Sequence, residues 1–261
     1  MTYVALDPRF AALLDPASSS APEASVGETK PGMGAASLPT SPPYMGVGAQ
    51  QPLPRLGPDG SVVLADDANP TSKHSLPEAS PQPDKFSAGY SQGGYVVSET
   101  SVNATGPPVD QAEVKLPGAY SDVSIAVDVA LVNPADDQYA DIACRSQGAD
   151  SEYRFAIFPT SKQFALNRLV NGFGISLSGL QSSAAIRDGS QTNRIELTCR
   201  GTTLEGSING QQVISVSDVI YGGGGLWIGM GQLVAGTIPG SVTPVGSPVA
   251  VRFTNLVVTQ R

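Results

Sequence analysis

Acidic side chains at alternate positions are the first pattern in this sequence that could do chemistry. Hydrolysis of a glycosidic bond with retained configuration needs two carboxyl groups on one face, about 5 Å apart. Asp150 and Glu152 have this spacing, but they lie at a predicted turn close to Arg154, where we expect a solvated hairpin tip. Asp122 and Asp128 share one face of a predicted strand, yet roughly 20 Å separates them at the usual rise per residue. The sequence therefore predicts no catalytic carboxylate pair.

Other catalytic arrangements also lack their partners. The only histidine, His74, lies in a segment rich in proline and serine, so no core histidine stands beside a serine or cysteine nucleophile. The glycine run at 222–225 is not followed by the Lys-Ser/Thr of a phosphate-binding loop, and we interpret it as a flexible strand connection. These absences predict a protein that is not an enzyme.

Metal ligands are equally sparse. Zinc needs four ligands, and a single histidine with two cysteines does not supply them. Asp136 and Asp137 could bind calcium through a loop, although two adjacent acids are also ordinary in loops. We predict no cofactor and no metal, with a structural calcium ion as the alternative.

Carbohydrate binding would require exposed aromatic rings that stack on sugars. The candidates in the second part of the chain are Tyr139, Tyr153, Phe164, Tyr221 and Trp227. Of these we select Tyr139, Tyr153 and Trp227 as contacts. Trp227 alternates with Leu226 and Ile228 in a predicted strand, so packing in the core is an equal alternative to ligand contact.

The two cysteines, Cys144 and Cys199, both lie in segments predicted to be strands. A disulfide that closes this loop of 55 residues would contribute about 4 kcal/mol in an oxidising compartment. Two buried thiols that act as small apolar residues are the alternative. The residues by themselves leave both open.

The elements that would position these groups are strands. From residue 61 onward, short runs rich in β-branched residues are divided by Gly, Asn, Asp and Pro. The expected strands cover 61–65, 94–100, 112–116, 122–132, 139–146, 153–158, 163–169, 174–178, 194–200, 203–208, 212–217, 226–230 and 249–259. Because no amphipathic helix separates them, the pattern predicts an all-β, antiparallel two-sheet sandwich.

Two local patterns are specific. Alternating apolar residues in the strand at 122–132 should face one core; these are Val123, Ile125, Val127, Val129 and Leu131. Asn209-Gly210 between two short strands is the preferred dipeptide of a type I′ hairpin.

Composition divides the chain in two. Residues 1–85 hold 14 of the 22 prolines but only three of the 16 aromatic residues. We predict an extended arm at 1–60, rich in Pro, Ala, Ser and Gly, and one sandwich domain at 61–261. A short helix is expected at 7–15, where Phe10, Leu13 and Leu14 share a face that would dock on a protein partner. An unstructured terminus is the alternative.

Charge argues against a nucleic acid partner, and the first residues bear on the location of the protein. The net charge is −8, from 15 basic and 23 acidic residues, and no basic cluster could follow a nucleic acid backbone. The first residues contain neither a secretory signal nor an apolar run long enough to span a membrane.

Several segments resemble a known family: DDANP at 66–70, GYSQGGYVV at 89–97, SDVSIAVDVALV at 121–132, IACRSQGADSEYRFAIFPTSKQFALNRL at 142–169, NRIELTCRGTTLEGSINGQQVISVSD at 193–218 and VRFTNLVVTQ at 251–260. Together they resemble the concanavalin A-like lectin/glucanase domain, a LamG-like jelly roll, of the non-enzymatic bacterial extracytoplasmic type. DDANP lacks the usual aromatic residue of its motif, and Thr254 stands where the family usually has Asp. Glucanases of this family carry E-x-D-x-E on one strand, which is absent here.

The resemblance implies a jelly-roll fold and a disulfide between Cys144 and Cys199 across neighbouring strands. It also implies an extracytoplasmic location, which the missing signal peptide opposes. Our preferred hypothesis is a non-catalytic interaction subunit whose arm tethers the sandwich to a larger protein assembly, for example one at a membrane. The alternatives are a lectin-like carbohydrate-binding module and a glycoside hydrolase of the same fold.

Overall fold

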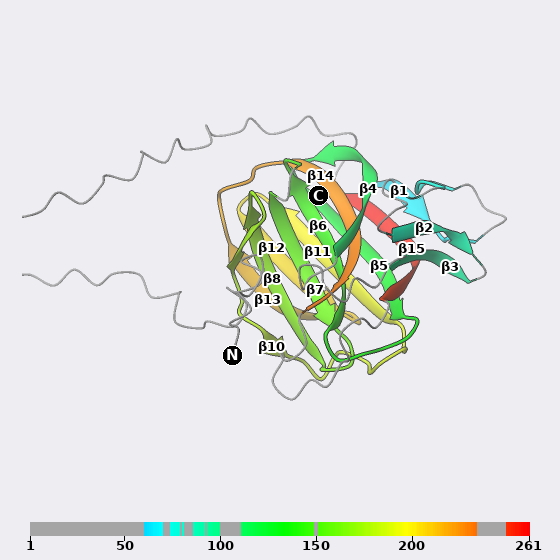
Figure 1. Ribbon diagram of the computed structural model, residues 1–261. Helices are drawn as coiled ribbons and strands as arrows, with labels where there is room; N and C mark the ends of the chain where they lie inside the picture. Colours follow the sequence, from blue (N-terminus) through cyan, green and yellow to red (C-terminus); the bar gives the residue numbers. More distant parts are fainter. Residues whose placement is uncertain are drawn as a thin grey trace, which may run out of the picture.

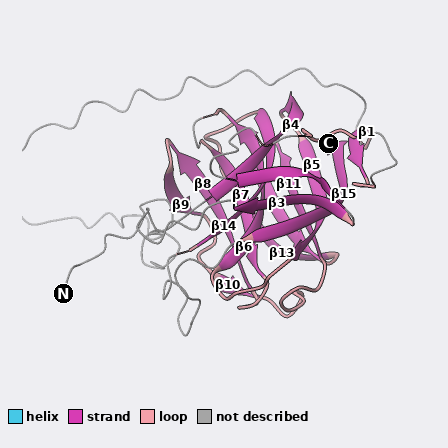
Figure 2. Ribbon diagram, turned by 45° about the vertical axis from the view of Figure 1, so that its right-hand side comes forward, coloured by secondary structure: helices cyan, strands magenta, loops and turns pink. Residues whose placement is uncertain are grey.

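The computed structural model describes residues 60–69, 74–78, 80, 86–91, 93–99, 111–148, 151–233 and 249–261. Within these ranges the regular secondary structure is entirely β-strand (Figures 1 and 2). No helix in the described part is long and apolar enough to cross a membrane. The predicted helix at 7–15 and almost all of the predicted arm lie outside the described residues.

The strands form two antiparallel sheets, as predicted. One sheet contains β1 (Val62–Asp66), β2 (Phe86–Ser91), β3 (Gly94–Glu99), β5 (Val123–Leu131), β11 (Asn193–Arg200), β12 (Thr203–Ile208), β13 (Gln211–Ser217) and β15 (Ala250–Gln260). Its order is β13-β12-β11-β5-β15-β3-β2, with β1 also paired to β15. In Figure 1 the last strand, in red, therefore lies beside the first, in cyan.

The second sheet has seven strands. These are β4 (Gln111–Tyr120), β6 (Gln138–Ser146), β7 (Glu152–Phe158), β8 (Gln163–Val170), β9 (Phe173–Ser176), β10 (Gln181–Ser182) and β14 (Gly224–Gln232). The order is β10-β8-β7-β6-β14-β4, and β9 also pairs with β8. The insertion of β14 between β4 and β6 brings together segments that are far apart in the sequence.

The main core lies between the two sheets. All five alternating residues of β5 that were predicted to face it are buried, which confirms the expected phase of that strand. At the β12–β13 hairpin, Asn209 and Gly210 have φ angles of 50° and 81°, as a type I′ turn requires. The strand ends and turns thus follow the local sequence closely.

Cys144 and Cys199 form a disulfide, as the family resemblance implies. Cys144 is on β6 and Cys199 is on β11, so the bond connects the two sheets rather than neighbouring strands of one sheet. Both side chains point into the core between the sheets, where their Cα atoms are 6.8 Å apart. The disulfide therefore fastens the two layers of the sandwich to each other.

Candidate functional site

The outer face of the seven-stranded sheet gathers ionisable and aromatic side chains. Because side chains alternate along a strand, the residues between the core-facing ones project outward. One cross-strand row on this face consists of Lys115, Trp227, Ala143, Arg154 and Asn167. The next row contains Glu113, Gly229 and Asp141. The sheet order thus places charged residues of β4, β6 and β7 next to one another.

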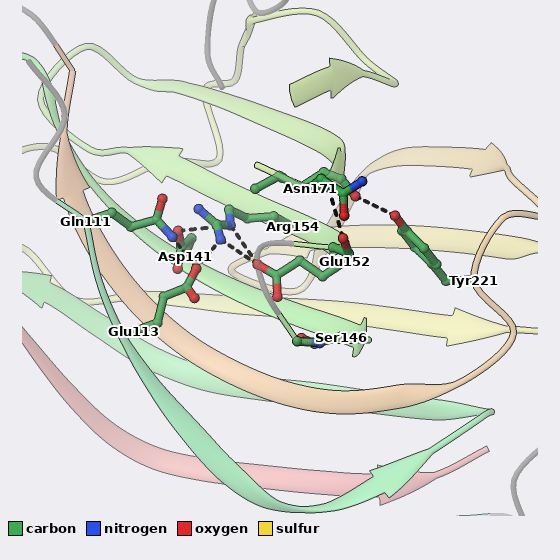
Figure 3. A network of polar contacts seen from close by, with 11 residues as sticks. Gln111, Glu113, Asp141, Ser146, Glu152, Arg154, Asn171 and Tyr221 are labelled. Carbon is green, nitrogen blue, oxygen red and sulfur yellow. Dashed lines mark hydrogen bonds and ion pairs between the residues drawn. The ribbon is translucent and has the colours of Figure 1, made fainter. Parts of the chain in front are cut away.

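Arg154 lies at the centre of a buried ion network (Figure 3). Its Nη2 contacts the carboxylates of Glu113 and Glu152, and its Nε lies 3.6 Å from Oδ2 of Asp141. The amide of Gln111 donates a hydrogen bond to Glu113. Three carboxyl groups around one guanidinium leave the network with an excess of negative charge.

The network shifts the titration of its members. Burial raises the pKa of Asp141 to about 6; Arg154 opposes this shift, and Glu152 adds to it. Burial alone would lower the pKa of Arg154, but Glu113, Glu152 and Asp141 together raise it well above its usual value. The guanidinium is therefore permanently charged, whereas Asp141 changes its protonation state near pH 6.

Glu152 corrects one expectation. It was predicted to lie at a solvated hairpin tip, but its side chain is only 1% exposed and is paired with Arg154. The reason is that every residue of β7 is buried, so the outer face of this strand is covered as fully as its inner face. Asp150, the other acid of that predicted pair, lies outside the described residues.

Several buried polar atoms on this outer face lack a hydrogen-bond partner among the described residues. They are Oε1 of Gln111, Oδ2 of Asp141, Nη1 of Arg154, Oε1 of Gln163 and Nε1 of Trp227. A buried donor or acceptor without a partner costs about 1–3 kcal/mol. The buried ion network is therefore only partly satisfied by the described residues.

A pocket of about 570 Å³ opens beside this network. Trp227 and Lys115 line it together with Ser146, Gln147, Ala119 and the glycines Gly118, Gly148, Gly223, Gly224 and Gly225. Trp227 is partly exposed there, whereas most other residues of its strand are buried. Trp227 and Arg154 lie in the same cross-strand row with the buried Ala143 between them, and the residues of the ion network are not among those that line the pocket.

The glycine run at 222–225 has a different role from the predicted flexible connection. Gly224 and Gly225 belong to β14, where they pair with β4 and β6. A Cβ on Gly224 would lie 2.3 Å from the carbonyl oxygen of Ser146, and the φ of Gly224 is 153°. Gly224 therefore permits a close approach of two backbones at the pocket wall.

The aromatic candidates separate into one exposed and several buried residues. Tyr139 and Tyr153 are both 0% exposed, which corrects the prediction that they contact a sugar. Tyr139 packs against Phe158, with ring centroids 5.5 Å apart, and the hydroxyl of Tyr153 donates to Oδ1 of Asp218 at 2.6 Å. Phe164 and Tyr221 are also buried, so Trp227 is the aromatic candidate that remains.

The remaining predicted groups lie away from this face or outside the described residues. His74 stacks on Tyr90 of β2, in the other sheet. The docking residues Phe10, Leu13 and Leu14 are not among the described residues, so their role stays a prediction. In the described part of the chain no group of three or more His, Cys, Asp or Glu residues could hold a metal ion. Calcium at Asp136 and Asp137 likewise stays a prediction.

Sequence reasoning missed Glu113, Asp141 and the buried state of Arg154. A signal was available, because each is a charged residue in the middle of a segment with strand periodicity. What the sequence did not contain was the order of the strands, which makes these residues neighbours.

Solved structures with similar folds have low sequence identity to this chain. Carbohydrate-binding module CBM66 from Bacillus subtilis is 10% identical, over 67% of this chain and 92% of that one, with a TM-score of 0.51. A β-glucanase from Bacillus licheniformis is 13% identical, over 77% and 99% of the two chains, with a TM-score of 0.56. The laminarinase catalytic domain of Thermotoga maritima is 11% identical, over 78% and 99%, with a TM-score of 0.54. No family model matches the sequence, and no curated protein is significantly similar to it.

These similarities show that the sandwich has a concanavalin A-like jelly-roll fold, in agreement with the fold that the sequence motifs imply. The same fold is present in a binding module and in glucanases. It is therefore compatible with carbohydrate binding and with hydrolysis, and the choice between them depends on the site.

Proposed function

We propose that this jelly roll is a carbohydrate-binding protein that holds its glycan on the outer face of the seven-stranded sheet, beside Trp227. The observation that carries the proposal is the partly exposed indole of Trp227 in the 570 Å³ pocket. An accessible aromatic face matches a sugar, which presents an apolar C–H face and a rim of hydroxyl groups. The similarity of the fold to a carbohydrate-binding module supports this choice.

Binding without hydrolysis is the simpler use of this site. Each of the three carboxyl groups in the network faces Arg154, and a carboxylate held in an ion pair is a weakened nucleophile or base. Such a module also suits the non-catalytic subunit that the sequence suggests, with the arm as its tether. The tether remains part of this proposal.

The test compares Trp227→Ala with the matched variant Phe173→Ala, which removes an exposed aromatic ring from β9. Affinity electrophoresis in gels that contain β-1,3(4)-glucan, galactan, xylan or uronate polymers would measure binding. We expect at least one polymer to retard the wild-type protein. Trp227→Ala should bind that polymer with an affinity lower by about tenfold or more. Phe173→Ala should behave as wild type. Absence of binding to every polymer, or equal binding by Trp227→Ala, would contradict the proposal.

Hydrolysis is the second candidate, and one observation favours it. Burial raises the pKa of Asp141 to about 6, which is suitable for a general acid, and carboxylates of Glu113 and Glu152 lie in the same network. Release of reducing ends from the same polymers would reveal this activity. If it occurs, Asp141→Asn should abolish it, and the absence of release would leave binding as the function.

A further inference from the structure

We infer that the sugar stacked on Trp227 carries an anionic group, a carboxylate or a sulfate, and that the ammonium group of Lys115 binds this group. The pocket therefore prefers acidic polysaccharides to neutral ones. This inference rests on the proposed carbohydrate binding and names the class of glycan.

The residues that carry the argument are open to a ligand. Lys115 and Gly118 of β4 are exposed, and so are Gln147 and Gly148, which follow the end of β6; all four line the pocket. Trp227, also in the lining, is partly exposed. A ligand can thus contact the indole and the ammonium group without entering the buried ion network.

Lys115 and Trp227 are close enough to contact one sugar. They are paired residues of the neighbouring strands β4 and β14, and the Cβ atoms of such pairs are about 5 Å apart. The Cε atom of Lys115 lies 3.8 Å from the position that a Cβ on Gly225 would take. Gly225 and Trp227 both line the pocket, so the lysine stem lies over the part of β14 that carries the indole. One ring can therefore stack on the indole while its charged substituent contacts the ammonium group.

The pocket has a positive charge and no described negative one. Lys115 is the one charged residue among the described residues of the lining. Within the described part of the chain, no carboxyl group forms an ion pair with it. Glu113, two residues away on β4, is paired with Arg154 instead. An ammonium group in such a pocket attracts an anion, and partial exclusion of water strengthens the attraction.

The charge of the whole chain argues against a general attraction to polyanions. Because the net charge is −8, an acidic polysaccharide is repelled by the molecule as a whole. Binding of such a polymer therefore requires a local contact that outweighs the repulsion. For this reason the binding should depend on Lys115 in particular and not on lysines elsewhere on the surface.

The walls of the pocket are held in place by the protein itself. Nε2 of Gln147 donates hydrogen bonds to the carbonyl oxygens of Arg145, at 2.9 Å, and of Gly223. This side chain thus joins the end of β6 to the segment that enters β14. The backbone N–H of Gly148 donates to Oγ of Ser146 at 3.2 Å. A preformed pocket loses little conformational freedom when a ligand binds, so that more of the contact energy appears as affinity.

The experiment compares ligands that differ only in charge, by isothermal titration calorimetry. Oligogalacturonate is compared with its methyl ester, and carrageenan oligosaccharides with their desulfated form; β-glucan and galactan oligosaccharides complete the set. The first pair tests a carboxylate and the second a sulfate. We expect wild-type protein to bind the charged member of at least one pair about tenfold more tightly than the neutral member, as one charge-assisted hydrogen bond would give.

Three variants test the assignment to Lys115. Lys115→Met removes the charge and keeps most of the stem, so it should bind the acidic ligand about tenfold more weakly and the neutral ligand as wild type does. Lys115→Arg should keep the preference for the acidic ligand. Lys162→Met is the matched control, because Lys162 is also exposed but lies at the turn between β7 and β8, outside the lining of the pocket.

The outcomes separate this inference from the function on which it rests. If no oligosaccharide binds, both are wrong. If binding depends on Trp227 but the members of each pair bind equally, or Lys115→Met behaves as Lys162→Met, only the inference about Lys115 is overturned. Thermal unfolding of each variant identifies a folding failure, and the comparison of paired ligands on wild-type protein needs no variant.

Discussion

Asp141 and Arg154 illustrate how a buried charge is tolerated in this fold. Desolvation of an ionised carboxyl or guanidinium is costly unless partners compensate it. Arg154 has three such partners, whereas the 3.6 Å contact with Arg154 is the one ion pair of Asp141 among the described residues. Burial of this weakly compensated carboxyl group raises its pKa. Asp141 is thus the least well compensated member of the network.

The raised pKa predicts a dependence of stability on pH. A pKa that rises from 3.8 to about 6 on folding means that the native state binds the proton more tightly than the unfolded chain. The contribution of Asp141 to stability is therefore fully present below about pH 4 and is lost as the pH rises through 6, by about 3 kcal/mol. Asp141→Asn should remove this contribution.

Urea unfolding of wild-type protein and Asp141→Asn at pH values from 4 to 7 checks this prediction. Relative to Asp141→Asn, the unfolding free energy of the wild-type protein should fall as the pH rises across that range. The comparison between the two proteins isolates Asp141 from the other titrating groups. Asp128→Asn, which removes a carboxyl group paired with Arg194 in the other sheet, is the control variant. A pH-independent difference for Asp141→Asn would show that burial does not perturb its carboxyl group.

At the scale of elements, all of the strands expected from the sequence occur, with ends that differ by a few residues at most. Two strands were missed. In β2, Phe86, Ala88 and Tyr90 do alternate with small polar residues or glycine, but the strand is short and rich in Ser, Ala and Gly, so its signal is weak. β10 has only two residues, which is too short to show a period. Burial on both faces of β6 and β7 was missed as well, because alternation indicates which residues share a face and does not indicate what covers that face.

A glycine pair in β14 allows a test of strand packing. In Gly224→Ala the new Cβ would meet backbone atoms of Arg145 and Ser146 at 2.3–2.8 Å, at a positive φ, and neither backbone can yield cheaply. We expect a loss of about 3 kcal/mol or more of unfolding free energy. The neighbouring Gly225→Ala is the control, because its Cβ has no neighbour closer than 3.8 Å, and it should cost under about 1 kcal/mol. Equal losses in the two variants would contradict this account of the close approach.

The whole molecule consists of two sheets packed face to face and connected by one disulfide. Because Cys144 and Cys199 belong to different sheets, the bond restrains the relative position of the layers as well as the unfolded chain. It also lies on the core side of β6, the strand that carries Asp141 on its outer side. The architecture thus stabilises the sheet on which the candidate site is built.

Replacement of both cysteines by alanine tests this contribution. A loop of 55 residues predicts a loss of about 4 kcal/mol of unfolding free energy, measured by urea denaturation without reductant. Addition of dithiothreitol should destabilise wild-type protein and leave the double variant unchanged. A double variant as stable as wild type would mean that core packing alone holds the layers together.

The sequence by itself determined the strands, the type I′ turn at Asn209-Gly210 and the core-facing phase of β5, because alternation and turn preference are properties of neighbouring residues. It also indicated the fold family through its motifs. Only the tertiary structure decided that Glu113, Asp141 and Glu152 surround Arg154, and that Trp227 lies in the same row. Those contacts depend on β14 lying between β4 and β6. The paired residues are 79 or more positions apart in the chain, and a pairing at that separation cannot be recognised from the local sequence.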